Sequence, residues 1–146
     1  MVDPVVRPAR SSDVEQLRAL EREVRAALIG QRGGDRWLET HAVRDEHWAD
    51  AVTAGDVAVA VIGEVVVGYL VSRHAGQIAY IDEVYVTPDA RRVGFGDALV
   101  EAATAAGRTA RCRAIEGEAL PGDRETKNLY ERAGITARLL VVSKSL

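Results

Sequence analysis

Residues 86–100 have the sequence VTPDARRVGFGDALV, which places paired arginines and spaced glycines between a strand pattern and a helix pattern. A helix N-terminus leaves backbone N–H groups unpaired and carries partial positive charge, so it favours a phosphate. Gly94 and Gly96 lack a Cβ and let an anion approach the backbone. Arg91 and Arg92 can add guanidinium donors to the same anion. The stretch therefore predicts a phosphate-binding turn that joins a strand to a helix.

Two other phosphate-binding loops fit this stretch less well. A P-loop needs a lysine followed by serine or threonine, and GFGDAL contains no lysine. A dinucleotide-binding turn needs a third glycine, and Leu99 stands at that position. In favour of such a turn, Glu116 lies about 20 residues further on, where dinucleotide-binding folds have an acid that binds the ribose. Hairpin patterns before the turn also argue against that fold. A nucleotide-binding domain is the weaker alternative.

Apolar spacing in the rest of the chain predicts a single α+β domain over residues 1–146, with a mixed and mostly antiparallel sheet. Residues 14–28 carry apolar side chains at helical spacing and end before Gly30, which is typical of a helix C-terminus. Residues 31–36 are expected to form a loop, and Gly107 is expected to end its helix. The expected elements are a strand at 5–9, helices at 11–30 and 44–55, strands at 57–62, 65–73 and 77–86, a helix at 96–107, a strand at 109–120, a helix at 122–134 and a last strand at 135–146.

The composition excludes several classes of protein. A net charge of −3 and a pI near 5.6 do not suit a protein that binds nucleic acid. The single cysteine, Cys112, excludes an internal disulfide, and His41 and His47 lack a third partner, so no metal site is expected. No run is long and apolar enough to cross a membrane, and no leader pattern is present. We therefore expect a cytoplasmic protein.

Residues 128–135 have the sequence NLYERAGI, a short predicted helix with a tyrosine followed by a glycine. Together with the RxxGxG pattern of Arg91, Gly94 and Gly96, this motif resembles the acetyl-CoA-dependent N-acetyltransferases of the GNAT superfamily. The resemblance covers nearly the whole chain. It implies a V-shaped splay between the fourth and fifth strands and direct transfer of an acetyl group to a primary amine of a small cationic molecule or a protein. This chain is expected to depart from the family in a shortened C-terminal strand region. Arg92 stands where the family often has glycine.

The resemblance also implies where the coenzyme binds. The backbone of residues 84–86 is expected to hydrogen-bond the pantetheine arm, and the N–H groups of residues 93–97 are expected to meet the pyrophosphate. Asp97 is expected to point away from the phosphate or to cap the helix. The residues implied to bind the coenzyme are Val84, Tyr85, Val86, Arg91, Arg92, Val93, Gly94, Phe95, Gly96, Asp97 and Asn128.

Acetyl transfer to an amine needs a proton acceptor for the amine and a proton donor for the departing thiolate. The resemblance implies that Tyr130 is the donor. It implies Glu118, twelve residues before Tyr130, or Glu83 as the acceptor, with Glu118 ranked first. Neighbouring strand residues point to opposite faces, so Asp82 and Glu83 are not expected to line one site. These acids, with Glu116, favour a cationic acceptor.

The acceptor site is open to several interpretations. The family has two C-terminal strands that close over the acceptor, and this chain shows one strand pattern after residue 134. The site is then either wide and suited to a macromolecule, or completed by a second subunit of a homodimer. Trp37 and Trp48 fall where the family often forms a wall of the acceptor pocket, and core positions suit them equally. A non-catalytic acyl-CoA-binding sensor or regulatory module of the same fold is the alternative to an enzyme.

Overall fold

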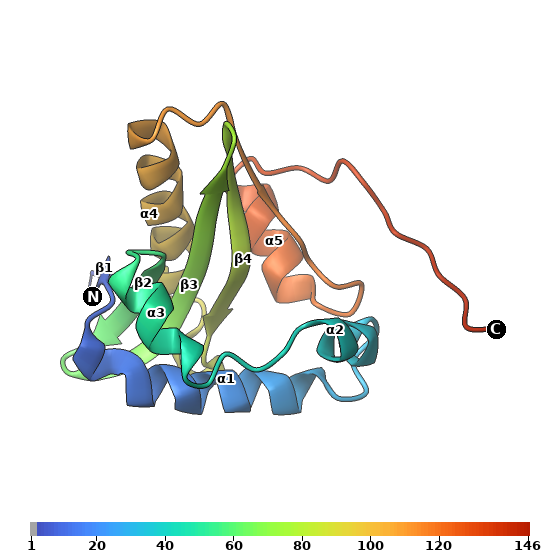
Figure 1. The fold of residues 1–146 in the computed structure, drawn as a ribbon, viewed down its shortest axis with the longest axis horizontal. Coiled ribbons are helices and arrows are strands. Elements are labelled where there is room, and N and C mark those ends of the chain that lie inside the picture. Colours follow the sequence, from blue (N-terminus) through green and yellow to red (C-terminus); the bar gives the residue numbers. More distant parts are fainter. Residues whose placement is uncertain (1–2) are drawn as a thin grey trace.

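A five-stranded sheet with its strands in sequence order lies at the centre of the molecule (Figure 1). The computed structural model describes residues 3–146. Strands β1, β2, β3 and β4 are antiparallel to one another in succession, and β5 is parallel to β4. This arrangement confirms the predicted α+β class with a mixed, mostly antiparallel sheet. The strands are β1 Val5–Pro8, β2 Val57–Ile62, β3 Val65–Ala75, β4 Ile78–Val86 and β5 Ala114–Gly117.

Helices cover both faces of this sheet, since neighbouring residues of β3 join different cores. Leu70 packs with Leu99 of α4 on one face, and Tyr69 packs with Leu17 of α1 and Trp48 of α3 on the other. No helix in residues 3–146 is long and apolar enough to cross a membrane. The helices are α1 Val14–Leu28, α2 Gly34–Thr40, α3 His47–Thr53, α4 Phe95–Thr109 and α5 Arg124–Arg132, with 3-10 turns η1 Ser11–Asp13 and η2 Pro88–Ala90.

The predicted splay lies between β4 and β5. Their pairing ends at Ile81 and Gly117, whereas β4 continues to Val86 along β3 alone. The β3–β4 register shifts between Glu83 and Ile81, so Asp82 is an extra residue in β4. Such a bulge bends a strand locally. The bulge therefore accounts for the separation of β4 from β5 at this point.

Three sequence-based expectations about the elements are wrong. Residues 135–146 do not form a strand and have no regular secondary structure. Gly107 does not end its helix, because α4 continues to Thr109 and a Cβ at Gly107 would lie 3.2 Å from the Cβ of Ala79. This glycine instead lets α4 approach β4 closely. The region around residues 31–36, expected as a loop, contains the start of α2.

Candidate active site

A cleft of about 800 Å³ opens where β4 and β5 separate. One wall is β4 from Asp82 to Val86, and another is the turn before α4. The remaining walls come from α5, from the end of α1 with α2, and from the loop 118–123 that joins β5 to α5. The cleft therefore brings together both motifs, although they are more than 30 residues apart in the chain.

The turn before α4 has the backbone conformation that an anion site needs. Gly94 is the N-cap residue of α4 with φ of 95°, and Arg92 has φ of 66°. Both values lie in the left-handed region, which glycine adopts at least cost. The first N–H groups of α4 have no intrahelical partners. Gly96 also lines the cleft, so the start of α4 is accessible from the cleft.

The charged side chains of this turn are held in different ways. The Arg91 Nε donates to the carbonyl of Val86 at 2.8 Å, which anchors its guanidinium at the end of β4. Arg92 is exposed, with its Nη2 3.7 Å from Glu125. Asp97 makes no N-cap hydrogen bond, and its carboxylate accepts from Arg132 Nε at 3.1 Å. Asp97 thus has its negative charge compensated by a cation on α5.

The other residues implied to bind the coenzyme lie on β4, at the start of α4 and on α5. From Asp82 to Val86 the β4 edge facing away from β3 has no strand partner, so its backbone N–H and C=O groups are available to a ligand. Val84, Tyr85, Val86 and Asn128 line the cleft. Val93 is exposed, the Phe95 side chain is buried in the core, and neither residue lines the cleft.

Tyr130 of α5 has a packed ring and a hydroxyl at the apex of the splay. The residue is 6% exposed and belongs to the core between the sheet and α4. A Cβ at Gly117, the last β5 residue paired to β4, would lie only 2.7 Å from Tyr130 Oη. Burial raises the pKa of Tyr130, and the charges of Asp123, Glu118 and Glu83 raise it further. The hydroxyl is therefore protonated at neutral pH and can donate.

Glu83 belongs to a hydrogen-bonded network that links β4 to β3, α1, α3 and the 41–46 segment. Its Oε1 accepts from Tyr69 Oη and from Arg44 Nη1, each at 2.7 Å. The same Nη1 donates to Glu21 Oε2 at 2.8 Å, and Trp48 Nε1 donates to Glu21 Oε1 at 3.2 Å. Glu21 of α1 is 1% exposed. Burial and the Glu83 charge raise the pKa of Tyr69 well above its usual value, so Tyr69 remains a donor.

Sequence reasoning missed the roles of Glu21, Arg44 and Tyr69. One sequence feature indicates Glu21, because it lies one turn after Leu17 and two turns before Leu28 on the apolar stripe of α1. A charged residue in such a stripe needs buried partners. Nothing in the local sequence indicates which residues those partners are.

The other candidate acids occupy different positions. Glu118 is exposed, follows β5 directly and lines the cleft. Asp82 and Glu83 both line the cleft, so the expectation that they could not share a site is wrong. The bulge at Asp82 breaks the alternation on which that expectation rests. Glu116 lies instead in a hollow of about 350 Å³ that Asp82 and Glu118 also line.

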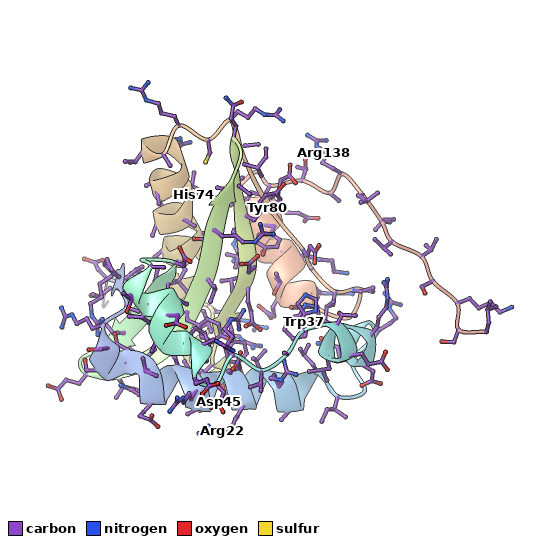
Figure 2. The ribbon with its side chains drawn as sticks, in the orientation of Figure 1. Arg22, Trp37, Asp45, His74, Tyr80 and Arg138 are labelled. Atoms are coloured by element: carbon purple, nitrogen blue, oxygen red, sulfur yellow. The ribbon has the colours of Figure 1, made fainter. Side chains whose placement is uncertain are left out.

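One end of the cleft is closed by a contact between distant loops. The Gly122 N–H donates to the Arg32 carbonyl at 3.0 Å, and Arg32 Nη2 donates to the Pro121 carbonyl at 3.2 Å. Trp37 lines the cleft here, stacked on His41 at 4.2 Å between ring centroids, and Figure 2 shows it beside the start of α5. Trp48 is fully buried and is a core residue. Of the two tryptophans, Trp37 is therefore the one in the pocket wall.

This geometry suits a ligand with an extended polar arm and a phosphate. The open β4 edge matches the arm, and the start of α4 with two arginines matches the phosphate. No group of three or more His, Cys, Asp or Glu residues in the described part of the chain is placed to hold a metal ion. A protonated tyrosine and several carboxylates at the apex can exchange protons with a reacting group there.

Comparison with known proteins identifies the family. The model of the acetyltransferase (GNAT) family matches residues 16–135, which include both motifs. Aminoglycoside N-acetyltransferase AAC(6')-Iy in complex with CoA has a TM-score of 0.72 at 15% identity, with 99% of this chain and 95% of that chain covered. A tetramutant of the BH1408 protein from Bacillus halodurans has a TM-score of 0.77 at 19% identity, with 97% and 99% covered. The PaiA N-acetyltransferase from Thermoplasma acidophilum with coenzyme A has a TM-score of 0.75 at 14% identity, with 90% and 89% covered.

A search of curated proteins finds no match to the sequence. The family model nevertheless covers most of the chain, and the structures above share its fold. These findings confirm the resemblance inferred from the two motifs. The chain belongs to the GNAT acetyltransferase family.

Proposed function

We propose that the protein transfers an acetyl group from acetyl-CoA directly to a primary amine. The observation that carries this proposal is the position of Tyr130 Oη, against Gly117 where the β4–β5 pairing ends. The cleft that Tyr130 lines is also lined by the open edge of β4 and by the carboxylates of Glu83 and Glu118. This position supports Tyr130 as the proton donor at the end of the coenzyme arm.

The coenzyme supplies the acetyl thioester, and this chain supplies its binding surface. The backbone of Val84 to Val86 is proposed to pair with the pantetheine arm as a strand would. The start of α4, with Gly94 and Gly96 exposing its N–H groups, is proposed to bind the pyrophosphate. Arg91, anchored to the Val86 carbonyl, adds a guanidinium at the junction of the two surfaces.

The proposed reaction moves two protons. A carboxylate accepts the proton of the amine, the amine nitrogen bonds to the acetyl carbon, and the carbon–sulfur bond breaks. Tyr130 Oη then donates its proton to the sulfur. The raised pKa of Tyr130 means that the hydroxyl carries its proton at neutral pH, so a donor is present when the thiolate leaves. Coenzyme A and an N-acetylated amine are the products.

Glu118 is the proposed proton acceptor. Its carboxylate lines the cleft and makes no hydrogen bond to residues 3–146, so it is free to bind an amine. Glu83 is the alternative, with Oε1 held by Tyr69 and Arg44. Six carboxylates line the cleft: those of Asp97 and Glu125 lie beside Arg132 and Arg92, and the other four are those of Asp82, Glu83, Glu118 and Asp123. These charges favour a cationic amine over a neutral or acidic acceptor.

Ligand binding and turnover test the proposal in sequence. Acetyl-CoA should raise the melting temperature, whereas NAD and ATP should not. Thiol release from acetyl-CoA is then measured over a panel of polyamines, aminoglycosides and peptides with free N-termini or lysines. Tyr130→Phe keeps the packed ring and should lower kcat about a hundredfold or more, while Tyr80→Phe, outside the cleft, serves as the matched control.

The alternative, a coenzyme-binding module without catalysis, predicts a different pattern. Acetyl-CoA would still raise the melting temperature, but no amine would release thiol above the uncatalysed rate. Tyr130→Phe would then change nothing except stability. If NAD or ATP raises the melting temperature and acetyl-CoA does not, both the enzyme and the coenzyme-binding module are rejected.

A further inference from the structure

Glu23 of α1 holds two side chains at the end of β4, where α1 passes that strand (Figure 1). Tyr85 Oη donates to Glu23 Oε2 at 2.6 Å, and Thr87 Oγ1 donates to the same oxygen at 2.9 Å. Residues 85 and 87 are the two neighbours of Val86, whose carbonyl accepts the hydrogen bond from Arg91 Nε at 2.8 Å. One carboxylate oxygen therefore holds the chain on both sides of the carbonyl that anchors Arg91.

The same part of the strand fixes Arg91 in a second way. Its guanidinium carbon lies 5.6 Å from the centroid of the Tyr85 ring, and Tyr85 is buried. Among residues 3–146, no carboxylate forms a salt bridge with Arg91, whereas Arg92 lies 3.7 Å from Glu125. Of the two arginines in the turn, Arg91 is therefore the one whose position is set while its charge stays available to a phosphate.

Glu23 itself does not line the cleft, although Val24 and Ala27 of the same helix do. Its negative charge would also oppose the binding of a phosphate. The carboxylate can thus help such a ligand only through the donors that it holds. Burial raises the pKa of Tyr85, and the hydrogen bond to Glu23 raises it further, so the hydroxyl remains a donor at neutral pH.

We propose that Glu23 is a positioning residue that sets Arg91 in place for the pyrophosphate of the coenzyme. It does so by holding Tyr85, on whose ring the guanidinium lies, and Thr87, which follows the anchoring carbonyl. This role rests on the proposed function, in which Arg91 binds the pyrophosphate. It adds to the coenzyme site a residue of α1 that neither sequence motif contains.

A purely structural role for Glu23 predicts a different result. Leu17 and Leu20 already bury α1 against the sheet, and Glu23 is an exposed residue, so the loss of its two hydrogen bonds would lower stability only slightly. Coenzyme affinity would then stay the same, or would rise because a negative charge near the phosphate is removed. The positioning role predicts the opposite sign, a loss of affinity when that side chain is removed.

Calorimetry with coenzyme A measures the affinity of each variant without any turnover. Glu23→Ala should weaken binding about tenfold, because a charged hydrogen bond to a phosphate loses its geometry. Glu23→Gln keeps an acceptor oxygen for the two hydroxyls and should stay within about threefold of the wild type. Glu15→Ala removes another exposed carboxylate of α1, one that pairs with Arg18, and as the matched control it should leave the affinity unchanged.

A double-mutant cycle with Arg91→Met shows whether Glu23 acts through that arginine. Arg91→Met should weaken coenzyme A binding by itself, and adding Glu23→Ala should then cause no further loss. If circular dichroism shows that Glu23→Ala does not fold, Tyr85→Phe combined with Thr87→Val removes the same two hydrogen bonds and leaves α1 intact. Additive losses in the cycle, or an affinity that Glu23→Ala leaves unchanged or raises, would overturn the positioning role alone. A wild type that binds no coenzyme A would reject the proposed function and this role with it.

Discussion

Replacing Arg44 by methionine should destabilise the fold far more than its position in a loop suggests. The Arg44 Nη1 lies 2.8 Å from Glu21 Oε2 and 2.7 Å from Glu83 Oε1, and Glu21 is 1% exposed. Arg44→Met leaves two carboxylates together without their shared cation. The guanidinium carbon also lies 4.9 Å from the centroid of the Trp48 ring, so a contact with that ring changes as well.

The size of the effect follows from the burial of the pair. Breaking a buried ion pair on one side costs about 3–5 kcal/mol. The lower value is appropriate, because the Arg44 side chain is 20% exposed and Glu21 keeps its bonds from the Arg44 N–H and from Trp48. With roughly 2–4 °C lost per kcal/mol in a domain of this size, the melting temperature should fall by about 6–12 °C. A loss of this size is a large part of the roughly 5–15 kcal/mol that stabilises a domain.

Urea unfolding followed by tryptophan fluorescence and circular dichroism measures the change. Arg73→Met is the matched control, because Arg73 also pairs with a carboxylate, that of Asp82 at 3.1 Å, and covers the Tyr80 ring at 4.6 Å. Its side chain is 54% exposed, so its loss should cost at most about 1 kcal/mol. Adding Glu21→Gln to Arg44→Met removes the unpaired buried charge while keeping an acceptor, and should recover part of the stability. Equal losses for Arg44→Met and Arg73→Met, or no recovery in the double variant, would refute the reasoning.

Three further predictions concern the turn, the apex and the first helix. Arg92→Gly should keep the free energy of unfolding within about 1 kcal/mol of the wild-type value, because glycine tolerates the φ of 66° but has a more flexible unfolded state. Calorimetry should show an acetyl-CoA affinity lower by up to about fivefold, because one positive charge is lost. Gly117→Ala should displace the Tyr130 hydroxyl, which would lie 2.7 Å from the new Cβ, and lower kcat by roughly 10²-fold with a much smaller change in KM for acetyl-CoA. The hydrogen bond from Arg7 holds the pKa of Asp13 below its usual value, so its stabilising contribution should be complete above about pH 4 and lost as the pH falls. Urea unfolding at neutral and acidic pH should therefore show a weaker acid dependence in Asp13→Asn than in the wild type.

The coenzyme side of the site could be predicted from the sequence because its determinants are local. Gly94, Gly96 and the paired arginines lie within one strand-to-helix turn, and Tyr130 lies on a short helix with its own motif. The positive φ of Arg92 was not predicted, and it is a structural finding at the position where the family often has glycine. The predictions for the turn and for Tyr130 needed only a few neighbouring residues.

The acceptor side could not be predicted in the same way, because contacts between distant segments form it. Arg32 meets Pro121 and Gly122 across nearly ninety residues of sequence, and no periodic pattern indicates that meeting. The α2 helix has only seven residues, too few for a clear apolar stripe. At Asp82 the alternation rule failed because one extra residue in β4 shifted the register, which sequence spacing does not reveal.

The network around Glu83 affects how the loss of that residue must be interpreted. Because Glu83 Oε1 holds Arg44, which in turn holds Glu21, a fall in activity in Glu83→Gln can come from a lost proton acceptor or from a displaced 41–46 segment. The two causes differ in their pH dependence. Loss of the proton acceptor removes the acidic limb of the kcat/KM profile, whereas displacement of the segment lowers the whole profile without changing its shape. Glu118 makes no such bonds, so a changed profile shape in Glu118→Gln alone would assign the proton transfer to Glu118 and leave Glu83 a positioning residue.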